Sequence, residues 1–145
     1  TRWAEWNGKY RDDMRSFLKG DYWFAAAAAN RLTGSMDLYT GQYKGYDSSI
    51  NFITCHDGFS LWDLYSYNGK HNEDNGWNNS DGHDDNRSWN CGYEGKSDNP
   101  GIEALRKRMI KNACAVLLCS RGTPPASPQD TDPRRCDAPK SLFRR

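Results

Sequence analysis

The sequence is poor in the β-branched aliphatic residues that usually fill a sheet. Its 145 residues include one valine and four isoleucines, and the mean hydropathy is −1.01. A parallel sheet covered on both faces needs strands rich in Val, Ile and Leu, and only one such strand is evident here. The length suits one domain, but the core available to it is small. We therefore expect the chain, which starts at Thr1 rather than methionine, to be a piece of a larger domain.

Other absences exclude several classes of partner. The 20 Lys and Arg residues balance 19 Asp and Glu residues, so no charge excess favours nucleic acid or an anionic membrane. No apolar run reaches the roughly 18 residues that span a bilayer, and no leader peptide is recognisable. The five cysteines are odd in number and lack C-x-x-C spacing, which is typical of free thiols in a reducing compartment.

The one clear strand runs through residues 49–55 and ends at His56, Asp57 and Gly58. Aromatic and β-branched residues alternate with other side chains along it, as suits a pleated surface. Residues just past the carboxyl end of a strand face the ligand cleft in α/β folds. His56 and Asp57 are therefore the candidate functional residues.

A helix is expected directly after this strand. Ser60 has the character of an N-cap, Asp63 completes a capping box three residues later, and Phe59 can contact Leu64. Strand, charged pair and capped helix together form one βα unit, so the local pattern predicts an α/β protein.

Further helices are predicted at residues 10–19 and 102–119. Met14, Phe17 and Leu18 give the first a narrow apolar stripe, and Gly20 suits the position after its end. The second is the strongest helix. Its basic residues 106–108 and 111 are expected on a solvated face, and residues 113–118 are apolar all round and should be buried. The alanine run at residues 25–29 also favours helix.

A long polar loop is expected from Asn68 to Pro100, which makes it a functional loop or a disordered one. Its oxygen-bearing side chains Asp81, Asp84, Asp85 and Asn86 could hold Ca²⁺. Their spacing is not that of an EF-hand, however, and the same residues would serve equally in Asx turns. Apart from this candidate structural calcium, we expect no cofactor. His71 and His83 lack the spacing of zinc ligands and should be exposed to solvent.

The composition changes abruptly after Thr123. Residues 124–145 hold five of the six prolines and four arginines, with no apolar periodicity. We expect this tail to be disordered.

Five motifs, taken in order, resemble the glycogen-debranching and isoamylase enzymes of glycoside hydrolase family 13, the α-amylase family. They are WNGKYRD at residues 6–12, RLTGS with DLY at residues 31–39, INFITCHDGF at residues 50–59, DDNRSWNCG at residues 84–92 and GTP at residues 122–124. A His-Asp pair alone carries little information, but five ordered motifs are specific. The resemblance covers residues 1–124, and residues 125–145 lie outside it.

The resemblance implies a partial (β/α)₈ TIM barrel, comprising the later βα units only, with residues 50–54 on the seventh strand. It implies retaining hydrolysis of α-1,6 branch linkages in glycogen or amylopectin. By this match His56 bonds sugar hydroxyls at the cleavage subsite, and the Asp57 carboxylate stabilises the transition state. The nucleophile and the general acid would lie upstream of Thr1, and Glu5 does not match either of them.

One departure from the family concerns the eighth strand. The family continues after residue 124 into an apolar strand, whereas Pro125 and Pro128 here cannot build a central strand. The closure of a barrel is therefore not expected from this chain. The fragment alone should also be inactive, because the nucleophile and the general acid would lie upstream of it. The implied location is the cytoplasm, or the plastid stroma in a plant or alga.

Two other functions fit parts of the pattern. A non-catalytic α-glucan-binding or regulatory subunit would keep the same motifs and aromatic residues after losing its catalytic carboxylates. A metal phosphohydrolase could use His56 and Asp57 with His71 or His83, but it leaves the other motifs unexplained. The expected partner under the leading hypothesis is a branched α-glucan.

Overall fold

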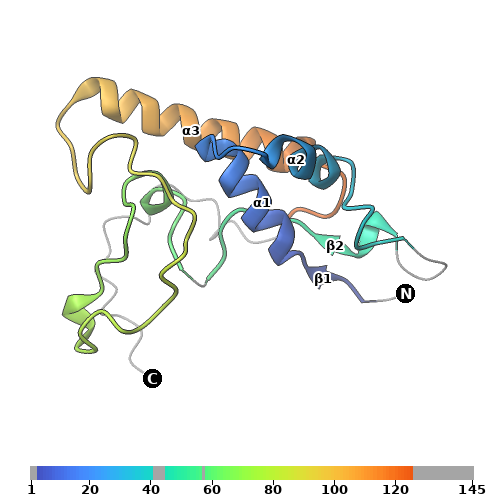
Figure 1. The fold of residues 1–145 in the computed structure, drawn as a ribbon, viewed down its shortest axis with the longest axis horizontal. Coiled ribbons are helices and arrows are strands. Elements are labelled where there is room, and N and C mark those ends of the chain that lie inside the picture. The colour runs from blue at the N-terminus through green and yellow to red at the C-terminus, as the bar shows by residue number, and fades with distance from the viewer. Residues whose placement is uncertain (1–2, 41–44, 57, 126–145) are drawn as a thin grey trace.

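The computed structural model describes residues 3–40, 45–56 and 58–125. Along the chain it contains β1 (Glu5–Trp6), α1 (Gly8–Lys19), α2 (Phe24–Leu32), β2 (Ser49–Ile50) and α3 (Pro100–Cys119), with short 3₁₀ turns at Tyr46–Ser48, Asp63–Tyr65 and Glu73–Asn75. In Figure 1 the long α3 lies above α1, and the loop that precedes α3 extends away from the two strands.

The strands are parallel and follow one another in chain order. Glu5 pairs with Ser49 and Trp6 with Ile50, and Ile50 also forms a parallel bridge to Thr123. Helices α1 and α2 connect the first two extended segments, and α3 lies between the second and third. The result is a small mixed unit of helices and short strands, consistent with part of an α/β enzyme.

Helix α1 confirms the helix predicted at residues 10–19. The Asn7 side chain caps it by accepting a hydrogen bond from the Tyr10 amide at 2.8 Å, which satisfies one of the unpaired first-turn donors. Gly20 ends the helix in the left-handed conformation, with φ of 93°. Tyr10 and Met14, one turn apart, are both 0% exposed, so this face of the helix carries much of the core.

Helix α3 confirms the second predicted helix, with Asn99 as its N-cap and Pro100 in its first turn. Its buried apolar side chains are Met109, Ile110, Ala113 and Leu117. The expectation that residues 113–118 are buried on every side is wrong, because Leu118 is 73% exposed. The alanine run lies within α2, as its helix propensity predicted.

The basic residues of α3 do not all face solvent, which corrects the sequence prediction. Arg106 is 0% exposed. Its Nη2 donates to the carbonyl oxygens of Asn90 at 3.2 Å and Tyr93 at 2.5 Å, and its Nη1 lies 3.1 Å from a carboxylate oxygen of Glu103. Lys107 and Arg108 are exposed as expected. The loop covers Arg106 because its carbonyl groups match the guanidinium's fixed fork of donors.

The helix expected after Ser60 is also wrong: only the 3₁₀ turn Asp63–Tyr65 forms. Its start is as predicted, since the Asp63 amide donates to the Ser60 hydroxyl at 3.2 Å. The loop then captures the groups that would continue it. Trp89 donates to the Leu64 carbonyl at 2.9 Å, and the Asn68 amide donates to the Glu94 carboxylate at 2.8 Å. A helix needs that carbonyl and that amide for each other.

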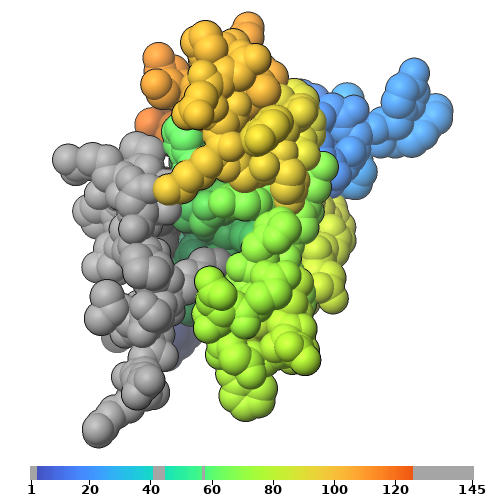
Figure 2. Space-filling model, turned by 90° about the vertical axis from the view of Figure 1, so that its left-hand side faces the viewer, coloured from blue at the N-terminus to red at the C-terminus, as the bar shows by residue number. Residues whose placement is uncertain are grey.

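The observed strand is shorter than the predicted one at residues 49–55, because only Ser49 and Ile50 lie in β2. The core lies between α1, α3 and residues 53–65, where Ile53, Phe59, Leu61 and Leu64 are each 5% exposed or less. The loop and α3 form one continuous face in Figure 2, beyond which the blue segment joining α1 to α2 projects.

None of the helices that the structure describes is long and apolar enough to cross a membrane. Of the tail predicted to be disordered, residues 124–145, all but residues 124 and 125 lie outside the described residues.

Candidate functional site

The segment that carries His56 begins inside the protein and reaches its surface. The Asn51 amide donates to the Thr123 carbonyl at 2.9 Å, and the Thr123 amide donates to the Ser49 carbonyl at 2.8 Å. Residues 51–54 are 1–4% exposed, and His56 is exposed. The structure thus places His56 at the surface, but β2 ends at Ile50, so His56 does not directly follow the strand as predicted. Asp57, the other candidate, lies outside the described residues.

A buried polar network fixes the base of this segment. Asn7 Nδ2 donates to the hydroxyl oxygens of Ser35 at 3.0 Å and Ser49 at 2.9 Å. The Ser49 hydroxyl donates to Asn51 Oδ1 at 2.7 Å, and Asn51 Nδ2 donates to the Arg121 carbonyl at 2.8 Å. The side chains of Asn7, Ser35, Ser49 and Asn51 are each at most 2% exposed. The network therefore joins four of the five family-like motifs, or their immediate neighbours, in one place.

Gly122 leaves the room that this network needs. Its φ is +127°, and a Cβ built on it would lie 2.5 Å from Asn51 Nδ2. No side chain fits at that distance without displacing Asn51. Glycine at residue 122 thus keeps the third extended segment against β2.

The remaining motif, DDNRSWNCG at residues 84–92, contacts the His56 segment through Arg15 and the Asn86 side chain. Arg15 of α1 donates from Nε to the Ile53 carbonyl at 2.8 Å and from Nη1 to the Asn86 carbonyl at 2.9 Å. The Asn86 side chain donates to the His83 carbonyl at 2.7 Å. Its Oδ1 would lie 3.0 Å from a Cβ built on Gly58, whose φ is +80°. The loop is thus packed directly against the residues that follow His56.

Aromatic side chains lie beside the same segment. The rings of Trp6 and Phe52 meet edge to face, with centroids 5.1 Å apart, and the Arg11 guanidinium lies 5.7 Å from the Phe52 ring centroid. Trp6 is 51% exposed, whereas Trp3 is 82% exposed. Trp6 therefore packs against the strand segment and leaves about half its surface exposed to solvent.

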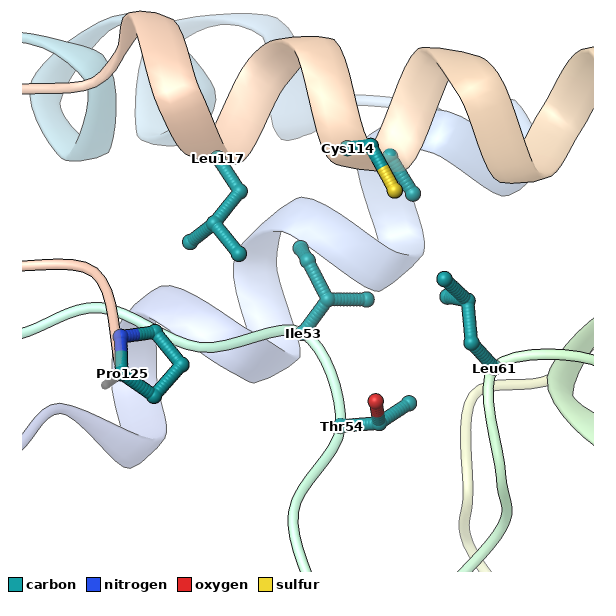
Figure 3. A pocket seen from close by; sticks show the side chains of 7 residues that line it. Ile53, Thr54, Leu61, Cys114, Leu117 and Pro125 are labelled. Atoms are coloured by element: carbon teal, nitrogen blue, oxygen red, sulfur yellow. The ribbon is translucent and has the colours of Figure 1, made fainter. Parts of the chain in front are cut away.

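An apolar pocket lies on the α3 side of the His56 segment (Figure 3). It is lined by Ile53, Thr54, Leu61, Ala113, Cys114, Leu117 and Pro125. Apart from one hydroxyl and one thiol, these side chains offer no hydrogen-bonding groups, which a sugar ligand requires. The pocket is a gap in the core rather than a glucan site.

The acidic loop residues that were candidates for calcium have partners within the protein. Asp81 accepts a hydrogen bond from Asn75 Nδ2 at 2.9 Å, and Lys70 Nζ lies 2.8 Å from Asp84. The Asp85 side chain accepts from the Arg87 amide at 3.2 Å, an Asx-type turn. In residues 3–40, 45–56 and 58–125, no three His, Cys, Asp or Glu side chains gather as metal ligands do.

Glu94 makes several of the contacts that hold the loop together. Its carboxylate accepts from the amides of Asn68 at 2.8 Å and Gly69 at 3.3 Å, and it contacts His71 Nε2 and Asn90 Nδ2, both at 3.0 Å. Burial raises the pKa of Glu94, but these hydrogen bonds together lower it to about 2. His71 and His83 are exposed as predicted.

Sequence reasoning missed the polar side chains that hold the site together. Asn7 was recognisable in principle, because it precedes a helix at the N-cap position. Arg15 and Asn86 carry no such signal: a polar residue in a helix or a loop looks solvated until the fold brings carbonyl groups to it.

Comparison with known proteins gives close matches along most of the chain, although no family model matches. The glycogen operon protein GlgX homolog of Mycobacterium tuberculosis is 56% identical over 122 residues, which are 84% of this chain and 17% of that protein. Isoamylase 3 of Oryza sativa is 50% identical over 85% of the chain and 16% of its own length. The glycogen debranching enzyme of Cronobacter sakazakii is 41% identical over 83% of the chain and 18% of its own length.

The chain therefore spans less than a fifth of the length of the curated relatives it matches. The identity is high enough, and extends over enough of the chain, to identify the segment. By this similarity, the chain belongs to the family of glycogen debranching enzymes and isoamylases, of which it represents one segment.

Proposed function

We propose that this chain forms part of the active site of an enzyme that hydrolyses α-1,6-glucosidic branch linkages in glycogen or amylopectin-type glucans. The observation that carries the proposal is the 56% identity to a GlgX homolog over 84% of the chain. Support also comes from the exposed position of His56 beyond the carboxyl end of β2, where α/β enzymes bind their ligands.

In the proposed reaction His56 and Asp57 have different roles. Positive charge develops on the sugar ring as the glycosidic bond breaks, so an ionised Asp57 stabilises the transition state more than the neutral substrate. His56 bonds hydroxyl groups that are present in both states, and it therefore contributes more evenly to binding and turnover. Retention requires a nucleophilic carboxylate and a general acid about 5–5.5 Å apart, and the resemblance assigns neither to a residue of this chain.

We also propose that β1, β2 and the segment at Thr123 are three successive strands of a (β/α)₈ barrel. Their parallel pairing in chain order, with helices between them, is what such a barrel requires. Residues 50–54 would then belong to the seventh strand, and the remaining strands would come from parts of the enzyme outside this chain.

A chimera tests the catalytic proposal. In it, the matching 122 residues of the M. tuberculosis GlgX homolog are replaced by those of this chain, and debranching of a branched glucan is followed by the release of reducing ends. Asp57→Asn should lower kcat by at least about 10²-fold, the scale of one lost electrostatic group, with little change in KM. His56→Ala should raise KM more than Asp57→Asn does.

The matched control is His83→Ala, which removes another exposed histidine and should leave both constants near those of the chimera. Near-normal turnover in Asp57→Asn would remove Asp57 from the mechanism. Binding of glucan without any hydrolysis by the folded chimera would favour the non-catalytic glucan-binding alternative. The 145-residue chain alone should release no reducing ends above a His56→Ala control, because one carboxylate cannot carry out a double displacement.

A further inference from the structure

We propose that Arg15 is a positioning residue that holds the His56 segment in its working geometry and couples it to the polar loop. The inference rests on the proposed function, because it gives the reason why a buried cation of α1 should matter for glucan hydrolysis. Arg15 does not touch the substrate in this proposal; it acts through the backbone on either side of His56.

The guanidinium of Arg15 joins two segments that are far apart in the sequence. It is 5% exposed, and it donates to the Ile53 carbonyl, 38 residues away, and to the Asn86 carbonyl, 71 residues away. The planar guanidinium presents its donors in a rigid fork, so both carbonyl groups must keep fixed directions. Ile53 precedes His56 by three residues, so this bond fixes the backbone close to the point where the chain reaches the surface.

The same arginine also sets the position of the chain after His56. It holds Asn86 by the backbone, and the Asn86 side chain lies against Gly58, where a Cβ would come within 3.0 Å of Oδ1. Gly58 has φ of +80°, a conformation that glycine adopts readily. Arg15 thus contacts the chain before His56 directly, at Ile53, and the chain after it through Asn86, at Gly58.

The cation is an expensive group to bury for stability alone. Burial lowers the pKa of Arg15 to about 10, so it stays protonated at neutral pH. Replacing a whole buried ion pair by apolar side chains is often neutral or stabilising, whereas removing one partner alone is destabilising. What an apolar side chain cannot do is orient two carbonyl groups at once, and that is the property the site needs.

Arg31 provides a matched control within the same part of the fold. It is 1% exposed, and its guanidinium lies 3.1 Å from a carboxylate oxygen of Asp13 and 2.6 Å from one of Asp37. These contacts join α1, α2 and the turn after α2. Arg31 is thus as deeply buried as Arg15, but Asp13 and Asp37 lie outside residues 53–58.

The experiment compares four variants in the GlgX chimera: Arg15→Lys, Arg15→Met, Arg31→Lys and Arg31→Met. All four should lower the melting temperature. The two Arg15 variants should lower kcat/KM, and the two Arg31 variants should not. Arg15→Met should lose about 10²-fold, the size of effect that a misplacement of about 1 Å produces. Arg15→Lys should retain more activity, because an ammonium group can keep one of the two carbonyl bonds.

Hydrogen exchange gives a readout that does not depend on activity. Peptides covering residues 53–59 should exchange faster in the Arg15 variants than in Arg31 variants of equal melting temperature, and peptides from α3 should not differ. Equal exchange and equal activity losses in the two pairs would overturn the inference. If Arg15→Met does not fold, Arg15→Lys against Arg31→Lys decides. A folded but inactive unsubstituted chimera would count against the proposed function alone, since the exchange comparison would still judge Arg15.

Discussion

Replacing Asn7 by alanine should destabilise the chain far more than the loss of an ordinary helix cap. The Asn7 side chain makes three hydrogen bonds: its Oδ1 accepts from the Tyr10 amide at 2.8 Å, and its Nδ2 donates to Ser35 and Ser49. Loss of an N-cap costs about 1 kcal/mol, and each further buried hydrogen bond contributes about 1 kcal/mol. We therefore expect the free energy of unfolding to fall by about 3 kcal/mol.

The chain contains its own control for this measurement. Asn99 caps α3 in the same way, accepting from the Gly101 amide at 2.8 Å, but it is exposed. Asn99→Ala should therefore cost only about 1 kcal/mol. Both variants are compared by urea unfolding, followed by tryptophan fluorescence. Asn7→Asp, which keeps the capping oxygen but loses both donors, should fall between Asn7→Ala and the unsubstituted chain.

Equal losses in Asn7→Ala and Asn99→Ala would refute the reasoning. That result would mean that the hydroxyl groups of Ser35 and Ser49 find other partners at no cost, so that the network does not join β1, β2 and the turn after α2. We expect Asn7→Ala to lower the urea concentration at the unfolding midpoint and to leave the dependence of the free energy on urea concentration unchanged. The substitution acts on stability rather than on the compactness of either state.

Two further predictions concern the loop and the third extended segment. Gly122→Ala should cost about 1–3 kcal/mol, because its Cβ would collide with Asn51; the control Gly92→Ala has φ of +94° but meets nothing within 4 Å, so it should lose only about 1 kcal/mol. Hydrogen bonds hold the pKa of Glu94 at about 2, below its ordinary value of 4.5, so the stability that this carboxylate contributes is present above about pH 4.5 and is lost as the pH falls towards 2. Glu94→Gln should flatten that acid-dependent part of the urea midpoint, and an unchanged pH profile would contradict the assignment.

The helices were the predictable part of the fold, because their signals are local. The helix at residues 10–19 is indicated by the glycine that follows it, which adopts a left-handed conformation. The helix at residues 102–119 is indicated by the helical spacing of its apolar residues. The helix after Ser60 was wrong for a nonlocal reason. Its cap formed, but a loop more than 20 residues away supplied better partners for Leu64 and Asn68, and no pattern around Ser60 could reveal that.

The candidate site divides in the same way. The exposed position of His56 followed from its place after a strand, whereas its supports did not. Arg106 was expected on a solvated face because its neighbours Lys107 and Arg108 are basic, yet carbonyl groups of the loop surround it. Hydropathy cannot distinguish such an arginine from an exposed one, since the difference lies in what the rest of the chain brings to it.

The way the polar loop is closed has a consequence for how this segment can change in length. The Gly95 amide donates to the Ser66 carbonyl at 2.8 Å, and Glu94 grips the amides of Asn68 and Gly69, so the two ends of the excursion are tied side by side. The cost of closing a loop rises only slowly with its length. Residues near the tip, around Glu73–Asn75, can therefore be inserted or deleted without drawing apart the ends. This tip is the natural place to graft a foreign peptide or a small reporter domain into an enzyme of this family.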